Sequence, residues 1–264
     1  MKILFIGDIY GRPGRNTVSA ILPDLKKDRS IDLVIANAEN MRHGKGVNHS
    51  NVTEMREAGV DFFTSGNHIF KDATILDHLA DPDYPLLRPA NYPDEVPGNG
   101  HRVIESPDGK KLLVINVMGR VFMPGDLDCP FREVDKILKD FEGEELHGIF
   151  VDFHAEASSE KCALGHYLDG RVSAVVGTHS HIPTADQRIL NGGTAFQSDV
   201  GMTGPLDSVI GADKELVIEH FLTQMPLKIE VAGGPKVFQA LEIEIDDDSR
   251  KAVGLEFIQK TIDG

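Results

Sequence analysis

Short runs of apolar residues recur along this chain, and each ends in small or polar residues. Such runs predict β-strands buried on both faces, as in a parallel sheet that helices cover on either side. Because open α/β sheets bind ligands beyond the carboxyl ends of their strands, we expect the polar residues that follow these runs to meet at one edge. The clearest runs are residues 2–6, 32–36, 61–65 and 172–176.

Helical patterns lie between these runs and support an α/β fold. We expect helices at 16–28, 50–58 and 72–80, with Ser50 as the N-cap of the second helix. Pro23 stands inside the first helical pattern, so we expect that helix to be kinked or divided. The first half of the chain is therefore predicted to alternate strands and helices, the order that builds parallel sheets.

The second half of the chain changes character. Residues 82–109 are rich in Pro, Gly, Asn and Asp, which predicts a long surface excursion. After an amphipathic helix at 131–141, the tail alternates apolar and polar residues, which indicates antiparallel strands. The further strands that we expect are 111–117, 148–153, 228–231, 237–245 and 253–260.

These patterns predict an α/β fold with four layers, an αββα sandwich in which helices flank two mixed β-sheets. The chain of 264 residues is long enough for one large domain, and no internal repeat divides it, so we expect a single domain over residues 1–264. Asp8 interrupts the opening apolar run, which is too short for a signal segment or a membrane span. We therefore expect a cytoplasmic protein that does not contact membranes.

The chain is strongly acidic, because 42 Asp and Glu against 27 Lys and Arg give a formal net charge of -15. Binding to duplex nucleic acid requires many phosphates to be neutralised, so this charge disfavours it. A small anionic ligand is compatible with the charge if bound metal ions reverse the local field. With Trp 0 and Tyr 4 in the composition, the sequence shows no evident platform on which a base would stack.

Donor atoms for hard metal ions gather directly behind the predicted strands. Taken singly they are ambiguous, since Asp8 also fits a loop or helix cap, and the pair His179 and His181 fits a structural role equally well. Five separate segments, however, carry such donors at the carboxyl end of a strand, which predicts the site of a two-metal hydrolase. The candidate residues are Asp8, Glu39, Asn40, Asn67, His68, His154, His179 and His181.

The order of these motifs resembles that of the calcineurin-like metallophosphoesterases. The shared motifs are Gly-Asp at 7–8, NAEN at 37–40, GNH at 66–68, His154 and THSH at 178–181. The opening GDIYGRPGR, the NAEN segment, TSGNH and FQSDVGMTGP at 196–205 resemble more closely the YmdB-type bacterial cyclic-nucleotide phosphodiesterases. The resemblance spans almost the whole chain and implies the metallophosphoesterase fold.

The resemblance also implies a cofactor and its ligands. Tyr10 stands where the general pattern has a histidine, and Glu39 replaces the usual bridging aspartate. Two divalent or trivalent metal ions are implied; iron or manganese is favoured, and magnesium or zinc stays open. The YmdB-type pattern assigns Asp8, Glu39, Asn40 and His181 to one ion, and Asn67, His154 and His179 to the other, with Glu39 bridging.

The activity implied by the resemblance is hydrolysis of 2',3'-cyclic nucleotides, and of 3',5'-cyclic nucleotides as a further class, by in-line attack of a metal-bound hydroxide. His68 is then left unligated as the general acid that protonates the departing ribose oxygen. Arg12 is either a substrate contact or an ordinary surface residue. Two alternatives stay open: a broad phosphomonoesterase or phosphoprotein phosphatase, and a regulatory protein with a structural metal site. The sequence does not decide whether the protein forms a homo-oligomer.

Overall fold

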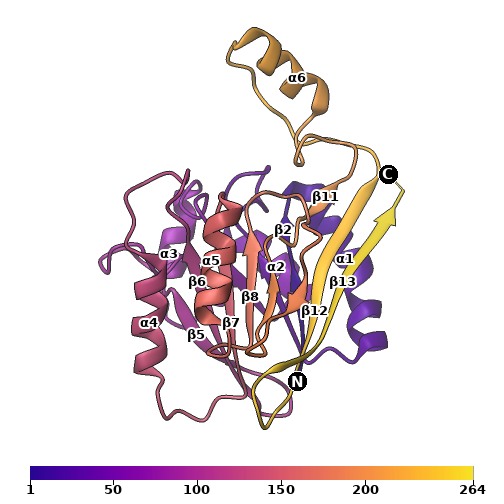
Figure 1. The fold of residues 1–264 in the computed structure, drawn as a ribbon. Coiled ribbons are helices and arrows are strands. Elements are labelled where there is room, and N and C mark those ends of the chain that lie inside the picture. The colour runs from indigo at the N-terminus through magenta and orange to yellow at the C-terminus, as the bar shows by residue number, and fades with distance from the viewer. Residues whose placement is uncertain (264) are drawn as a thin grey trace.

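The computed structural model describes residues 1–263 and contains two mixed β-sheets that pack face to face (Figure 1). In the first sheet, β1, β3 and β4 run parallel to one another, and β12 runs antiparallel to β1. The strands of this sheet, in order across it, are β2 (Asp8–Ile9), β11 (Met202–Pro205), β12 (Lys236–Ile245), β1 (Lys2–Ile6), β3 (Leu33–Asn37) and β4 (Phe62–Thr64), with β13 (Ala252–Ile262) paired along β12.

The second sheet has a parallel centre with one antiparallel strand at each edge. Strands β6, β7, β8 and β10 run parallel, whereas β5 is antiparallel to β6 and β9 is antiparallel to β10. The strands in order are β5 (His101–Glu105), β6 (Lys111–Met118), β7 (Gly148–His154), β8 (Ala174–Thr178), β10 (Ala195–Gln197) and β9 (Arg188–Ile189).

Helices form the two outer layers, and one helix stands apart from both. Helices α1 (Gly11–Arg29) and α2 (His49–Glu57) cover the first sheet, while α4 (Pro130–Asp140) and α5 (Ser158–Leu168) cover the second. A short 3-10 turn at Ala73–Ile75 leads into α3 (Leu76–Leu79). Helix α6 (Lys214–Thr223) projects above the body of the molecule (Figure 1). Within residues 1–263, no helix is both long enough and apolar enough to cross a membrane.

Alternation along each central strand explains why the layers stack. In β1, Ile3 and Phe5 point into the core between the sheets, whereas Leu4 and Ile6 point into the core beneath α1 and α2. Phe5 meets Phe150 of the opposite sheet, with ring centroids 4.9 Å apart. Because both faces of such a strand are buried, its sequence is continuously apolar. The four-layer αββα sandwich predicted from the sequence is confirmed.

The predicted helices needed correction at their starts. The first helix begins at Gly11 and continues through Pro23 without division, since Leu22 and Leu25 anchor the residues on both sides of the proline in the core. The second helix begins at His49 rather than at 50, and its N-cap is Asn48 rather than Ser50. The side-chain oxygen of Asn48 accepts a hydrogen bond from the backbone N–H of Asn51 at 3.1 Å.

The surface excursion predicted at 82–109 is wrong in part. Leu86 and Leu87 of this segment are buried, and Leu87 donates its backbone N–H to Phe63 of β4 at 2.9 Å. The segment also contains β5, which the sequence pattern did not indicate. The strand expected at 228–231 is absent from the described residues, where Val231 forms only an isolated bridge with Ala212. Antiparallel pairing of the tail is confirmed by β12 and β13.

Candidate metal centre

All eight candidate residues lie at the same edge of the sandwich. The strands β1, β3 and β4 of one sheet, and β7 and β8 of the other, end at this edge, so the turns that follow them meet there. The positions are Asp8 at the start of β2, Glu39 and Asn40 after β3, Asn67 and His68 after β4, His154 at the end of β7, and His179 and His181 after β8.

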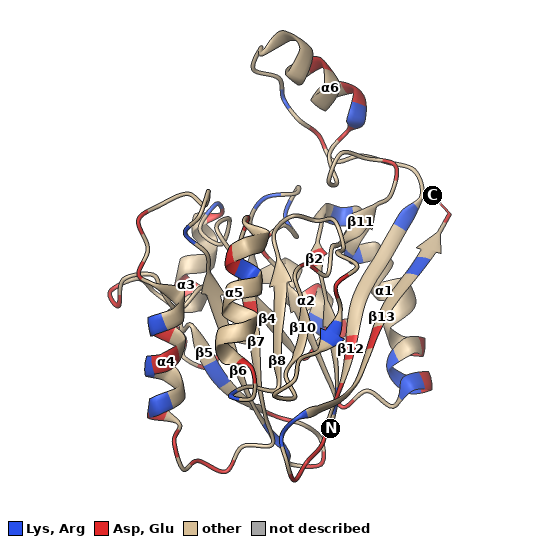
Figure 2. Cartoon of the chain, in the orientation of Figure 1, with Lys and Arg blue, Asp and Glu red and all other residues tan. Residues whose placement is uncertain are grey.

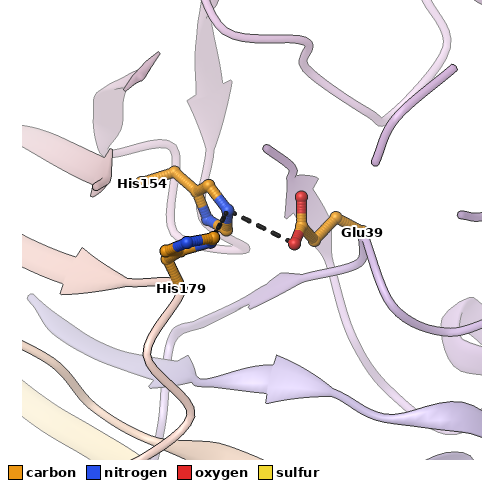
Figure 3. Close-up of side chains that lie close together, drawn as sticks. All are labelled: Glu39, His154 and His179. Carbon is orange, nitrogen blue, oxygen red and sulfur yellow. Dashed lines mark hydrogen bonds and ion pairs between the residues drawn. The ribbon is translucent and has the colours of Figure 1, made fainter. Parts of the chain in front are cut away.

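Glu39 lies at the centre of this group and is almost fully buried. Its Oε1 atom is 3.3 Å from Nε2 of His154, and His154 Nε2 is in turn 3.0 Å from Nδ1 of His179 (Figure 3). One donor atom from each of these three side chains fits within 4.8 Å of the other two, a spacing suited to a shared metal ion. The side-chain oxygen of Asn67 approaches the same His154 nitrogen at 3.1 Å.

A second group of side chains also meets at Glu39. Asn40 Nδ2 is 3.3 Å from Asp8 Oδ1 and 3.0 Å from His181 Nε2. The same amide is 3.1 Å from Glu39 Oε1, so Glu39 contacts both groups. The sequence resemblance assigns these residues to two ions, and that assignment stays a prediction. Tyr10 belongs to neither set; its ring packs edge-on against His181, with centroids 5.4 Å apart.

His68 occupies a distinct position at the rim of the centre. Its side chain is 21% exposed, whereas the side chain of Glu39 is 1% exposed. The Nδ1 atom lies 2.9 Å from the side-chain oxygen of Asn40, and the backbone N–H donates to Glu39 Oε2 at 3.0 Å. His68 is therefore oriented by the ligand-type residues while one side of its ring stays open to the pocket.

The electrostatics of the centre favour a bound cation. Burial raises the pKa of Asp8, although charge on His181 and His154 opposes the shift. Burial also opposes ionisation of Glu39, but charge on His154 and His68 holds the pKa of Glu39 well below its ordinary value. Buried carboxylates need a nearby positive charge, which a metal ion supplies without a proton. Carboxylate, amide and imidazole donors fit iron, manganese, magnesium or zinc.

A buried hydrogen-bond chain orients His154 and was not anticipated from the sequence. His154 Nδ1 lies 2.9 Å from Thr178 Oγ1, and Thr178 donates to Asp152 Oδ1 at 2.8 Å. Asn37 donates to the other Asp152 oxygen at 3.0 Å. Burial raises the pKa of Asp152 to about 6. Supporting contacts of this kind fix the orientation of a ligating imidazole. The sequence signal that could have revealed this chain of contacts is Asp152 itself, an acidic residue within an otherwise apolar strand.

A buried ion pair supports the loop that carries His179 and His181. Lys161 of α5 and Asp199 lie 2.7 Å apart, with side chains 3% and 1% exposed. Asp199 also accepts the backbone N–H of Ser180 at 2.9 Å, so the pair holds the residue between the two histidines. Glu156, another residue that sequence reasoning missed, lies 3.1 Å from His179 Nε2.

A pocket of about 410 Å³ opens over the centre. His68, His179 and His181 line its polar side, and Val217 and Phe221 of α6 belong to its apolar side. Tyr10 and Lys45 also line this pocket, whereas Arg12 does not and is exposed on α1.

Known proteins resemble this chain over nearly its whole length. A family model described as YmdB-like protein matches residues 4–258. The 2',3'-cyclic-nucleotide 2'-phosphodiesterase of Bacillus subtilis is 46% identical over 98% of this chain and 96% of its own length. A putative phosphatase/phosphodiesterase of Mycoplasma genitalium is 35% identical over 100% of this chain and 94% of its own length.

Solved structures also match this chain over nearly its whole length. A hypothetical protein from Thermus thermophilus matches with a TM-score of 0.91 and 43% identity, covering 99% of both chains. A novel phosphatase from Mycoplasma pneumoniae matches with a TM-score of 0.92 and 35% identity over 100% of this chain and 94% of its own. A 5'-nucleotidase precursor, at 12% identity and a TM-score of 0.61 over 54% of its length, shares the fold alone. The chain belongs to the YmdB-like protein family.

Proposed function

We propose that this protein is a metal-dependent phosphodiesterase that hydrolyses nucleoside 2',3'-cyclic phosphates and accepts 3',5'-cyclic nucleotides as a further class. The observation that carries the proposal is that two donor groups both contact Glu39, with His68 beside them at the pocket rim. The name of the Bacillus subtilis relative supports the same substrate class.

In this proposal Asp8, Asn40 and His181 hold one metal ion, and Asn67, His154 and His179 hold the other, with Glu39 between them. The contacts within each group and the burial of Glu39 support this division. Two bound ions, iron or manganese being favoured, would neutralise phosphate charge and lower the pKa of the attacking water.

His68 is proposed as the general acid for the leaving ribose oxygen. Nδ1 of His68 lies 2.9 Å from the side-chain oxygen of Asn40, which leaves Nε2 for a proton transfer to the substrate. Partial exposure of the ring at the pocket rim supports this role, since a substrate held over the ligands would approach from that side.

Initial rates on 2',3'-cyclic AMP, 3',5'-cyclic AMP and p-nitrophenyl phosphate would test the proposal. The purified protein is first stripped with a chelator and then reloaded with Fe²⁺ or Mn²⁺. We expect the 2',3'-cyclic substrate to have the highest kcat/KM and the monoester the lowest. A phosphatase is the second candidate, which the names of the two Mycoplasma relatives favour. Faster hydrolysis of the monoester than of either cyclic diester would select it.

A further inference from the structure

A second groove adjoins the pocket over the candidate metal centre. Its volume is about 540 Å³, and it shares Tyr10, Lys45 and Ile229 with that pocket. The two hollows are therefore neighbours, and the groove lies on the side of Tyr10 and Lys45 away from the candidate metal ligands. The remaining residues of the groove are Arg42, His43, Lys71, Asp72, Leu227 and Glu230.

The groove is lined by three basic and two acidic side chains, on a chain whose formal net charge is -15, and the exposed acidic one, Glu230, pairs with Lys228. Arg42 pairs with the buried carboxylate of Asp72. Lys45 and Lys71 are both exposed, and neither forms an ion pair with any residue in the described range 1–263. Figure 2 shows basic positions on loops at the upper edge of the sheets, beneath α6. Two unpaired lysines beside the pocket leave this surface able to neutralise an anion.

The loop that carries Lys45 is packed closely against its surroundings. Gly44 has a φ of +84°, and a Cβ atom there would lie 2.6 Å from the hydroxyl oxygen of Tyr10. Gly46 has a φ of +91°, and a Cβ atom there would lie 3.2 Å from Cβ of Lys71. Glycine adopts a positive φ readily and has no Cβ atom to clash at these close approaches. The two glycines therefore let the loop pack against Tyr10 and Lys71, which brings Lys45 and Lys71 to the same groove.

We propose that this groove binds a second phosphate, on the 5' side of the nucleoside whose cyclic phosphate lies at the metal centre. The inference rests on the proposed function and narrows its substrate class to 5'-phosphorylated nucleoside 2',3'-cyclic phosphates, either free or at the end of a short RNA. Tyr10 and Ile229, which line both hollows, supply apolar surface for the nucleoside between the two phosphates. Lys45 and Lys71 supply the charge for the second phosphate.

Calorimetric titration of the metal-loaded protein tests the inference with three probes: adenosine 3'-monophosphate, adenosine 3',5'-bisphosphate, and the dinucleotide ApA with a 3'-phosphate. We expect the bisphosphate to bind about 10-fold more tightly than the monophosphate, the effect of two solvent-exposed charge contacts. This advantage should shrink as salt is raised, because exposed charges are screened. If the dinucleotide gains more affinity over the monophosphate than the bisphosphate does, the groove is suited to the phosphate of an RNA end rather than to that of a free nucleotide.

Matched variants locate the effect. Lys71→Gln should reduce the ratio of the two affinities to about 3-fold, the loss of one exposed charge contact. Lys27→Gln removes the same charge from the exposed face of α1 and should leave the ratio as it is. Equal affinity for the monophosphate and the bisphosphate, or an unchanged ratio in Lys71→Gln, overturns the inference.

Hydrolysis of 2',3'-cyclic AMP, measured in parallel, separates the groove from the proposed function. If the protein hydrolyses 2',3'-cyclic AMP but binds the bisphosphate no more tightly than the monophosphate, the inference about the groove is refuted and the proposed function is not. A preference for the bisphosphate that Lys71→Gln removes, in a protein that hydrolyses no cyclic nucleotide, supports anion binding by the groove and refutes the proposed activity.

Discussion

Glu39 is the residue on which the two halves of the candidate centre depend. Its Oε1 atom lies 3.3 Å from His154 Nε2 of one group and 3.1 Å from Asn40 Nδ2 of the other. The sequence could predict that such donors meet, because strand direction alone brings them to one edge. It could not reveal that Asp152 supports His154 through Thr178, because these hydrogen bonds join side chains of two strands, β7 and β8, whose relative positions are set only in the folded sheet.

Replacement of Glu39 tests its proposed bridging role. Glu39→Gln keeps the size of the side chain but removes the negative charge that both donor groups share. We expect the variant to lose bound metal and activity together, measured by elemental analysis and by initial rates on 2',3'-cyclic AMP. Two retained equivalents of metal in Glu39→Gln would refute the bridge.

Replacement of His68 separates catalysis from metal binding. His68→Ala should retain metal and fold but lose about 10²–10⁴-fold in kcat, the usual contribution of positioned proton transfer. The loss should be far smaller for bis(p-nitrophenyl) phosphate, because its leaving group needs little protonation. His154→Ala, which removes a proposed ligand, should impair both substrates and serves as the control. Equal losses on both substrates in His68→Ala would exclude a general-acid role.

At the scale of elements, α5 supports the loop that carries two residues of the candidate metal centre. Lys161 reaches from this helix to Asp199, and Asp199 accepts the backbone N–H of Ser180 between the two loop histidines. The sequence pattern predicted neither α5 nor the short strands β9, β10 and β11. Such strands span as few as 2 residues, too short for a periodic pattern, and are defined by their partners in the folded sheet.

The buried pair between Lys161 and Asp199 should be strongly coupled. Lys161→Met leaves the carboxylate of Asp199 buried without its cation, which should lower the free energy of unfolding by about 3–5 kcal/mol. The double variant with Asp199→Asn removes the unpaired charge and should recover part of the loss. Denaturant titrations of the wild type and three variants measure this coupling. Strictly additive losses would show that the two side chains act independently.

At the scale of the whole molecule, the two sheets share the core that lies between them. Phe5 of the first sheet and Phe150 of the second are both fully buried and in contact. The layered fold could be predicted because these central strands are apolar on both faces. The burial of 86–87 could not, since these two apolar residues are too few to form a periodic pattern and lie among residues rich in Pro and Asn, while the cores that bury them are built from elements distant in sequence.

The shared core leads to a prediction about cooperativity. If residues 1–264 form one domain, the metal-free protein should unfold in one calorimetric transition, with equal calorimetric and van't Hoff enthalpies. Neither sheet keeps its inner face buried without the other, so neither should survive alone. Two resolved transitions would show that the sheets, or α6 and its flanking segments, unfold as separate units.

The most direct test of the proposed activity is a titration of chelator-stripped protein with Mn²⁺, followed by the rate of 2',3'-cyclic AMP hydrolysis. Two ions that act together in catalysis predict a negligible rate without metal and a rise that saturates near two equivalents at protein concentrations above the Kd. Hydrolysis that persists in the stripped protein, or that never appears as Mn²⁺ is added, would contradict a dinuclear phosphodiesterase centred on Glu39.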